Sequence, residues 1–278
     1  MYVISFINMK GGVAKTTLAI NVAHDLTRNG RKVLVIDVDP QFNATQCLIK
    51  PEEYEKHLDA GKDSILDIFE ANSKATASAV TGKTLVKSKS LQTIVPIKTS
   101  AGFDLLPGNL NLYKMEMPAG GGRENRLKIF VEHLKSTNNY DYVIIDTPPT
   151  PSVWMTSALL ASDFYLIPVK PDPISFTGID LLKSVVEDKK ENFGLNITCI
   201  GIVMTIVEES TKVYSICKNY LEKDPDHSKL LFKKMLLKRT EIAREQMNHK
   251  LICDSQHAPS RLALAGITSE LRKRLGDI

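Results

Sequence analysis

NMKGGVAKTT, residues 8–17, joins the apolar run VISFI (3–7) to a helical pattern, TTLAINVAHDLTRN (16–29). A buried strand, a glycine turn, a Lys-Thr pair and a helix in this order form a cradle for phosphate groups. The glycines let backbone N–H groups turn inward, and the N-terminus of the helix favours negative charge. In such a loop Lys15 would reach the β- and γ-phosphates of a nucleotide, and the Thr16 hydroxyl would ligate Mg²⁺. The stretch predicts a nucleotide site whose phosphate-binding residues are Gly11, Gly12, Val13, Ala14, Lys15, Thr16 and Thr17.

Two more apolar runs end in aspartate. VLVIDVDPQFNAT (33–45) carries Asp37 and Asp39, and YDYVIIDTPPT (140–150) carries Asp146. Carboxylates at strand ends can orient the waters that Mg²⁺ retains, and one of them can position an attacking water. A single aspartate at such a place more often caps a helix or forms a turn. The inference therefore depends on all three motifs occurring in order.

Apolar β-branched runs alternate with helical patterns along the whole chain. We expect strands at 3–7, 32–37, 91–97, 103–107, 142–146, 164–169, 197–205 and within 229–237. We expect helices at 16–29, 64–69, 123–136, 174–192, 212–223 and about 260–275. Such alternation predicts the α/β class, with a mostly parallel twisted sheet covered by helices on both faces. No internal repeat or linker is evident, so we expect one domain over residues 1–278.

The ordinary phosphate-loop pattern, G-x-x-x-x-G-K-[ST], has Met9 and Ala14 at its two glycine positions here. Instead, Lys10 precedes a pair of glycines. This arrangement resembles the deviant Walker A motif, K-G-G-x-G-K-[ST], of the ParA/MinD family of ATPases. Residues 33–45 resemble the switch I segment of that family, D-x-D-P-Q-G-N, and residues 140–150 resemble its Walker B strand and switch II.

The resemblance implies a P-loop NTPase fold, ATP and Mg²⁺ as cofactors, and slow ATP hydrolysis stimulated by a partner. It assigns Lys10, Lys15 and Asp39 to catalysis, with Asp39 as the hydrolysis residue. Thr16, Asp37 and Asp146 would support the metal. In family members the lysine that corresponds to Lys10 crosses to the nucleotide of a second subunit, which implies a homodimer in the ATP-bound state. Two positions depart from the family pattern, because Ala14 and Phe42 each stand where glycine is usual. A methyl group would crowd the phosphates, and a bulky ring would alter the mobility of the switch.

Resemblance further along the chain is weaker. Residues 164–182 and 201–205 are similar to segments near the base pocket, which implies base contacts from Pro171, Met204 and Thr205. Residues 239–252 are similar to an arginine-rich helix and following strand of partition ATPases. Those proteins bind double-stranded DNA without sequence preference, through lysine and arginine contacts to phosphates. Such a surface would use Lys212, Lys233, Lys234, Lys238, Arg239 and Arg244. A solvated basic face is the alternative explanation.

Bulk properties exclude several other classes. The net charge of +4 permits a polyanion partner without requiring one. Four separated cysteines without a CxxC pair argue against a disulfide framework, and none lies at 48–198, where the iron–sulfur branch of the superfamily places its cluster ligands. No feature resembles the acceptor-substrate lid of a small-molecule kinase.

The remaining alternative is an ATPase of the MinD type, which cycles on a membrane. The tail SELRKRLGDI lacks the aromatic residues of a membrane-binding helix, so we expect it to pack against the protein and membrane binding to be unlikely. We expect a cytoplasmic protein that works with a ParB-like or other small adaptor.

Overall fold

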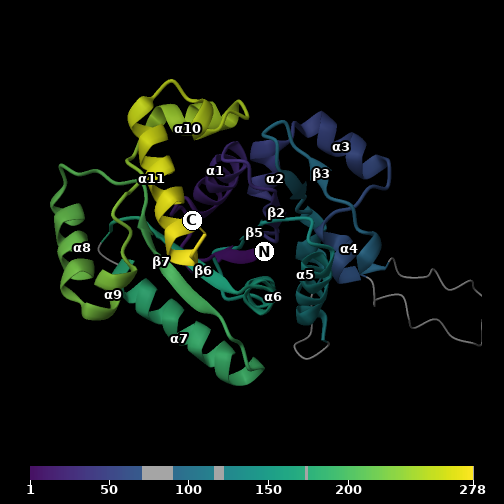
Figure 1. Cartoon of the computed structure of the whole chain (residues 1–278), viewed down its shortest axis with the longest axis horizontal. Coiled ribbons are helices and arrows are strands. Elements are labelled where there is room, and N and C mark those ends of the chain that lie inside the picture. The colour runs from purple at the N-terminus through teal and green to yellow at the C-terminus, as the bar shows by residue number, and fades with distance from the viewer. Residues whose placement is uncertain (71–89, 116–121, 173–174, 278) are drawn as a thin grey trace, which may run out of the picture.

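The computed structural model describes residues 1–70, 90–115, 122–172 and 175–277. Its centre is a seven-stranded sheet in the order β3-β4-β2-β5-β1-β6-β7 (Figure 1). The strands are β1 (Tyr2–Phe6), β2 (Val33–Asp37), β3 (Ile97–Lys98), β4 (Asp104–Leu106), β5 (Tyr142–Asp146), β6 (Phe164–Val169) and β7 (Thr198–Met204). Every neighbouring pair is parallel except β3 with β4. The predicted α/β class and mostly parallel sheet are confirmed.

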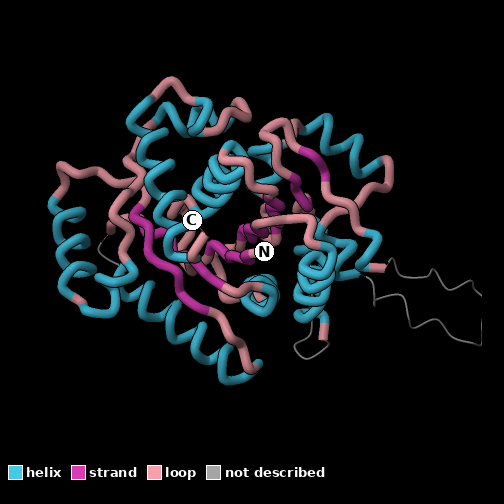
Figure 2. The backbone as a smooth tube through the Cα atoms, viewed as in Figure 1, coloured by secondary structure: helices cyan, strands magenta, loops and turns pink. Residues whose placement is uncertain are grey.

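Helices cover both faces of this sheet (Figure 1, Figure 2). They are α1 (Lys15–Arg28), α2 (Asn43–Leu48), α3 (Pro51–Asp59), α4 (Ile65–Glu70), α5 (Arg126–Thr137), α6 (Val153–Ala161), α7 (Ser175–Phe193), α8 (Lys212–Lys223), α9 (Pro225–Leu230), α10 (Thr240–Met247) and α11 (Ala258–Leu275). Alternate residues of β2 show the two layers. Val35 packs in one apolar cluster with α1 and α11, whereas Leu34 packs in another with α4, α5 and α6. Because successive strand side chains point to opposite faces, each strand contributes to both layers.

Three parallel strands bring their carboxyl ends to one edge, where the site lies. Asp37 at the end of β2 is directly opposite Asp146 at the end of β5. Phe6 at the end of β1 is opposite Asp146 on its other side. The chain leaves β1 and turns at once into α1, so the glycine loop sits at the same edge as both carboxylates. Open parallel sheets bind their ligands at this edge.

Some predicted strands are wrong. Residues 91–97 form a 3₁₀ turn at Leu91–Thr93, and only Ile97 joins a strand. Pro96 lacks an N–H to donate to a ladder, and the neighbouring Val95 is 67% exposed, so this stretch has neither the bonds nor the burial of a strand.

Two further predictions near the C-terminus are also wrong. Residues 229–237 run beside β7 but make only isolated bridges, at Leu231 and Leu237. The guanidinium of Arg274 donates hydrogen bonds to the carbonyls of Leu230 and Leu231. These two carbonyls are therefore not part of a continuous ladder with β7. After α10 the chain forms a 3₁₀ turn at Ile252–Asp254 instead of the expected strand.

The predicted packing of the tail is confirmed. In α11, Leu271 is fully buried in the cluster that contains α1, and Leu275 packs partly against it. Among the described residues, none of the helices combines the length and the apolar character needed to cross a bilayer.

Candidate functional site

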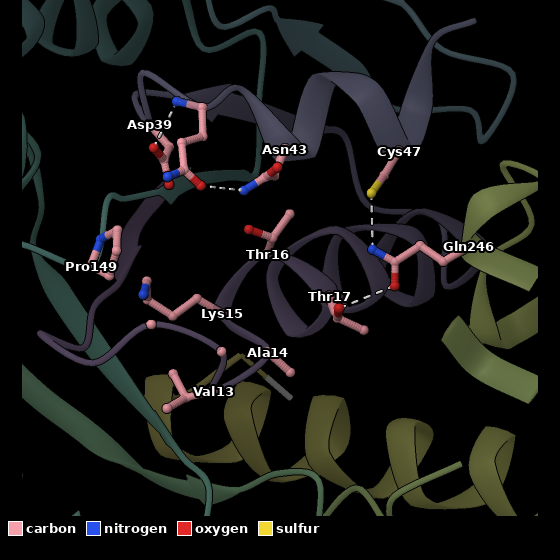
Figure 3. A pocket seen from close by; sticks show the side chains of 13 residues that line it. Val13, Ala14, Lys15, Thr16, Thr17, Asp39, Asn43, Cys47, Pro149 and Gln246 are labelled. Carbon is pink, nitrogen blue, oxygen red and sulfur yellow. Dashed lines mark hydrogen bonds between the residues drawn. The ribbon is translucent and has the colours of Figure 1, made fainter. Parts of the chain in front are cut away.

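A pocket of about 330 Å³ opens at the carboxyl edge of the sheet (Figure 3). All seven predicted phosphate-loop residues line it, from Gly11 to Thr17. The predicted hydrolysis residue Asp39 lines it as well. The remaining wall comes from residues that were not predicted as site residues. Gln41 and Asn43 lie in the switch I motif and Pro149 lies in the switch II motif, whereas Cys47 and Gln246 lie outside both. The phosphate loop and the switch I segment are therefore brought together as the sequence predicts.

The start of α1 is suited to an anion. Ala14 occupies the position before the helix, and no side chain caps the free N–H groups of the first turn. Four backbone donors at a helix N-terminus have no intrahelical partner, and together with the helix dipole they attract a negative group. Behind the loop, the Thr205 hydroxyl donates to the carbonyl of Val13 at 2.8 Å. This bond ties the loop to the end of β7.

Lys15 places a buried cation in the pocket. Its residue is only 7% exposed, and its Nζ donates to the carbonyl of Lys10 at 3.3 Å. Burial lowers the pKa of this ammonium, while the carboxylates of Asp146 and Asp39 act in the opposite direction. A phosphate group would supply the close counter-charge that the partly desolvated ammonium needs.

The carboxylates opposite the loop fit a magnesium site. The Thr16 hydroxyl donates to Asp146 Oδ2 at 2.6 Å, while Asp146 Oδ1 is buried and has no hydrogen-bond partner among the described residues. Asp37 Oδ2 accepts bonds from both the N–H and the hydroxyl of Thr45. Burial, with repulsion between neighbouring carboxylates, raises the pKa of both Asp37 and Asp146. Keeping these buried carboxylates charged costs free energy. A divalent cation nearby would offset that cost, because it stabilises the charged forms.

Thr16 and Asp146 would hold the ion or its water shell, and Asp37 would support it from the adjacent strand. In the part of the chain that is described, no three His, Cys, Asp or Glu side chains could hold a metal ion together. Mg²⁺ is usually bound by one or two protein groups together with phosphates and waters.

Asp39 faces the pocket from just beyond β2. It is 4% exposed, and its Oδ1 accepts a bond from the Gln41 N–H at 2.9 Å (Figure 3). Burial raises the pKa of this carboxyl, and the charge of Lys15 opposes that shift. Its place on the pocket wall, with one oxygen fixed by the backbone, is suited to orienting a water molecule.

Lys10 points elsewhere in the single chain. Its ammonium pairs with the Asp172 carboxylate, and its N–H donates to Asn8 Oδ1 at 2.9 Å. The side chain is 37% exposed and does not line the phosphate pocket. Its predicted role in a second subunit stays a prediction.

The predicted base contacts are only partly near the pocket. Met204 and Thr205 are buried behind the loop, and neither lines the pocket walls, nor does Pro171. A second, largely apolar pocket of about 250 Å³ shares Ala14, Thr17 and Gln246 with the first. Its other lining residues are Ile206, Leu236, Leu237, Lys238, Arg239, Thr240, Ile242, Ala243 and Ile252.

The basic residues named for DNA binding are all exposed, but they lie on several elements. Lys212 begins α8, Lys233 and Lys234 follow α9, and Arg244 lies on α10. Lys238 pairs with Glu208 at 2.9 Å, and with Arg239 it lines the second pocket, next to the phosphate loop. No sequence pattern indicated this closeness of Arg239 to the nucleotide site.

The two departures from the family pattern share one backbone feature. Ala14 has φ 57° and Phe42 has φ 42°, so both occupy the left-handed region that favours glycine. Phe42 gains a compensating contact, because its ring stacks on Tyr54 with centroids 5.6 Å apart. Ala14 has only a methyl side chain and cannot gain a stacking contact of this kind.

We expect Ala14→Gly to stabilise the protein by about 0.5–1 kcal/mol. Relief of left-handed strain contributes about 1–2 kcal/mol, and the greater freedom of glycine in the unfolded chain offsets about half of it. Urea unfolding checks this value. Phe42→Gly serves as the comparison, since it relieves the same strain but loses the stack on Tyr54 and should gain less. A destabilised Ala14→Gly protein would contradict the argument.

The chain is similar to one protein family, to two relatives in sequence and to one solved structure. The family described as "AAA domain" matches residues 1–199. The sporulation initiation inhibitor protein Soj of Bacillus subtilis is 30% identical over 76% of this chain and 75% of its own length. The chromosome partitioning protein ParA of Caulobacter vibrioides is 27% identical over 74% of this chain and 70% of its own. A plasmid partition protein of Borrelia burgdorferi, bound to AMPPNP, shares the fold with a TM-score of 0.75 and 23% identity, over 98% of this chain and 99% of that one.

Proposed function

The chain belongs to the ParA/MinD-type P-loop ATPases, within the AAA domain family, and from this premise we propose that it is an ATP-driven positioning switch. In this proposal residues 1–278 act as one ATPase domain, ATP joins two copies, and the dimer binds double-stranded DNA of any sequence. ATP hydrolysis then separates the copies. The cargo that moves is DNA, such as a plasmid or chromosome, or a protein assembly.

The observation that carries the proposal is the arrangement at the phosphate pocket. Lys15, with its buried ammonium, and the uncapped start of α1 line one pocket, and Thr16 in the pocket wall donates to Asp146. When bound, Mg²⁺ neutralises charge on the phosphates. Lys15 binds the phosphate oxygens, and Asp39 orients the attacking water from the opposite wall. Pro171, Met204 and Thr205 remain the base contacts proposed from sequence, and none of them lines the apolar pocket beside Ala14 and Thr17.

Lys10 is proposed to act in the partner subunit. In the ATP dimer its ammonium would leave Asp172 and bind the nucleotide of the other copy, which neutralises charge between two like-signed faces. We expect the protein to be monomeric with ADP and dimeric with a non-hydrolysable ATP analogue.

We expect Lys10→Ala to weaken the ATP-dependent dimer by roughly 100-fold and to leave ATP affinity within about threefold. Two symmetric charge-assisted bonds are lost, each contributing about 1.5 kcal/mol or more. Light scattering across a concentration series measures the dimer, and calorimetry measures ATP binding. A wild-type mass that does not change with the nucleotide would contradict the role of Lys10 in the partner subunit.

DNA binding is the test that separates this function from its alternatives. We expect the ATP-analogue form to bind unrelated duplexes with nearly equal affinity, and the ADP form to bind at least about tenfold more weakly. Dimerisation doubles the basic surface, and phosphate contacts carry no base information. Affinity should fall steeply as salt rises, because each neutralised phosphate releases counterions. Fluorescence anisotropy of labelled duplexes at several salt concentrations gives these values.

Charge-reversal variants test which basic surface of the protein binds DNA. Arg244→Glu with Lys233→Glu should weaken DNA binding by at least about tenfold while ATP-driven dimerisation persists. Arg239 is left intact because it lines the pocket beside the nucleotide loop. The control pair, Lys50→Glu with Lys98→Glu, makes the same change in net charge at two exposed lysines elsewhere. Equal loss in both pairs would point to net charge instead of a defined surface.

Membrane cycling of the MinD type is the second candidate. Capture of the ATP form by anionic liposomes, without DNA binding, would favour it. Leu271 and Leu275 would be the apolar side of a membrane-binding tail. Leu271 lies in the core and Leu275 packs partly against it, which favours DNA binding over membrane cycling. We further propose a cytoplasmic, nucleoid-associated location, and a ParB-like or other small adaptor that accelerates an otherwise slow hydrolysis.

A further inference from the structure

Gln246 joins three elements around the nucleotide pocket (Figure 3). This residue belongs to α10, near its C-terminal end. Its Oε1 accepts a bond from the Thr17 hydroxyl at 3.1 Å, and its Nε2 donates to Cys47 Sγ at 2.9 Å. Thr17 lies in the first turn of α1, and Cys47 lies in α2 beyond the switch I motif. One carboxamide therefore bridges the phosphate loop helix and the switch helix.

Helix α10 is held mainly by polar contacts, which also include the ion pair of Glu245 with Lys250 at 3.2 Å. None of its eight residues is buried. Ile242 packs partly against the core, and the His249 ring beyond the helix contacts the Cys47 carbonyl at 3.2 Å. Because so little apolar surface holds α10, its position depends strongly on polar bonds such as those of Gln246.

The bond to Thr17 competes with a bound nucleotide. Thr17 lines the phosphate pocket, and its hydroxyl carries a single hydrogen. That hydrogen is donated to Gln246 in the structure, so it cannot be donated to a phosphate oxygen at the same time. A charged acceptor makes the stronger bond and would displace the neutral carboxamide oxygen.

We propose that Gln246 is a positioning residue that couples occupancy of the nucleotide pocket to helix α10. Without nucleotide, Gln246 holds α10 against α1 and α2. When phosphates take the Thr17 hydroxyl, the bridge opens at that end and α10 is released to a new position. Arg239 at its start and Arg244 on its surface move with it. The inference rests on the proposed nucleotide site and does not require DNA binding.

Two measurements test the coupling without DNA. The first is hydrogen–deuterium exchange of the α10 backbone amides, with and without a non-hydrolysable ATP analogue. In the wild type, we expect nucleotide to raise α10 exchange several-fold. In Gln246→Ala, α10 should exchange at the faster rate in both states, because the bridge is already absent.

The second measurement is ATP-analogue affinity by calorimetry. Gln246→Ala should bind about two- to tenfold more tightly, since the nucleotide no longer breaks a hydrogen bond whose net contribution is modest. A residue with a merely structural role would not tighten nucleotide binding when removed. Gln246→Leu keeps most of the side-chain volume but makes neither bond, so it should behave as Gln246→Ala. Met247→Ala is the matched control: Met247 is next on the helix, 82% exposed, and should match the wild type in both measurements.

The outcomes separate this inference from the proposed function. If the wild type binds the analogue but its α10 exchange does not change, the coupling is wrong and the ATPase proposal stands. Weaker nucleotide binding in both Gln246 variants would also overturn the coupling, because Gln246 would then be a nucleotide contact. A wild type that does not bind the analogue at all would overturn both proposals.

Discussion

Lys15→Ala is expected to weaken ATP binding by at least about 100-fold. Lys15 is buried among carboxylates and is the cation of the protein that faces the phosphate pocket most directly (Figure 3). Breaking a buried charge pair costs about 3–5 kcal/mol, and a loss of about 2.7 kcal/mol already corresponds to a 100-fold weaker ATP affinity. The loss should be largest for ATP, because its γ-phosphate adds charge that Lys15 would neutralise. Calorimetric titration with ATP and ADP in the presence of Mg²⁺ measures both affinities.

The folding of Lys15→Ala must be tested as well, because loss of the Lys15 ammonium leaves Asp39 and Asp146 without their nearest cation. Lys15→Met retains most of the side-chain volume and gives a second measure of the lost charge. Lys10→Ala is the matched control, since it removes an equal charge from the same loop but at a side chain outside the pocket. Normal ATP binding by a folded Lys15→Ala protein would show that this loop does not hold the phosphates.

Asp39→Ala is expected to lower the turnover number by about 100-fold or more while ATP affinity is kept or slightly raised. Positioned acid–base groups contribute about 10²–10⁴-fold to rate, and this carboxylate is the one that lines the pocket. Removing its negative charge also favours the triphosphate near Lys15. Single-turnover hydrolysis separates the chemical step from nucleotide binding and release.

Two comparisons sharpen that test. Asp39→Asn keeps the shape of the side chain but not its charge, so a similar loss of rate would identify the carboxylate as the active feature. Asp59→Ala removes an exposed carboxylate from α3 and should hydrolyse ATP as the wild type does. If Asp39→Ala retains most of its turnover, the attacking water is oriented by another group, and Asp39 is a structural residue of switch I.

Sequence patterns predicted the strands that form the centre of the sheet, because these runs are buried on both faces. The runs at 3–7, 32–37, 142–146 and 164–169 are nearly continuous in apolar residues, as parallel strands are when helices cover both sides. The edges were harder to predict. The outermost strand β3 has only two residues, and residues 229–237 follow β7 without forming a ladder. At the edge of a sheet, a single residue such as Pro96, or a single contact such as that of Arg274, decides whether backbone groups pair in a ladder. Local composition does not encode such contacts.

The sequence alone determined the chemistry of the phosphate pocket. Its loop, its two aspartate motifs and their order are local, and the rule that parallel strands end at one edge brings Lys15, Asp39 and Asp146 together without knowledge of distant packing.

Only the tertiary structure decided which distant residues close the pocket and where the charged side chains of Lys10 and Arg239 lie. Gln246 reaches Thr17 across 229 positions, Lys10 pairs with Asp172 across 162, and Arg239 lies beside the phosphate loop. Contacts of this kind depend on how α7, α10 and the strand ends pack against one another, and no short-range period or spacing records them. The left-handed backbone at Ala14 and Phe42 was likewise decided by the tertiary structure. The surrounding fold imposes a conformation that neither residue favours by itself.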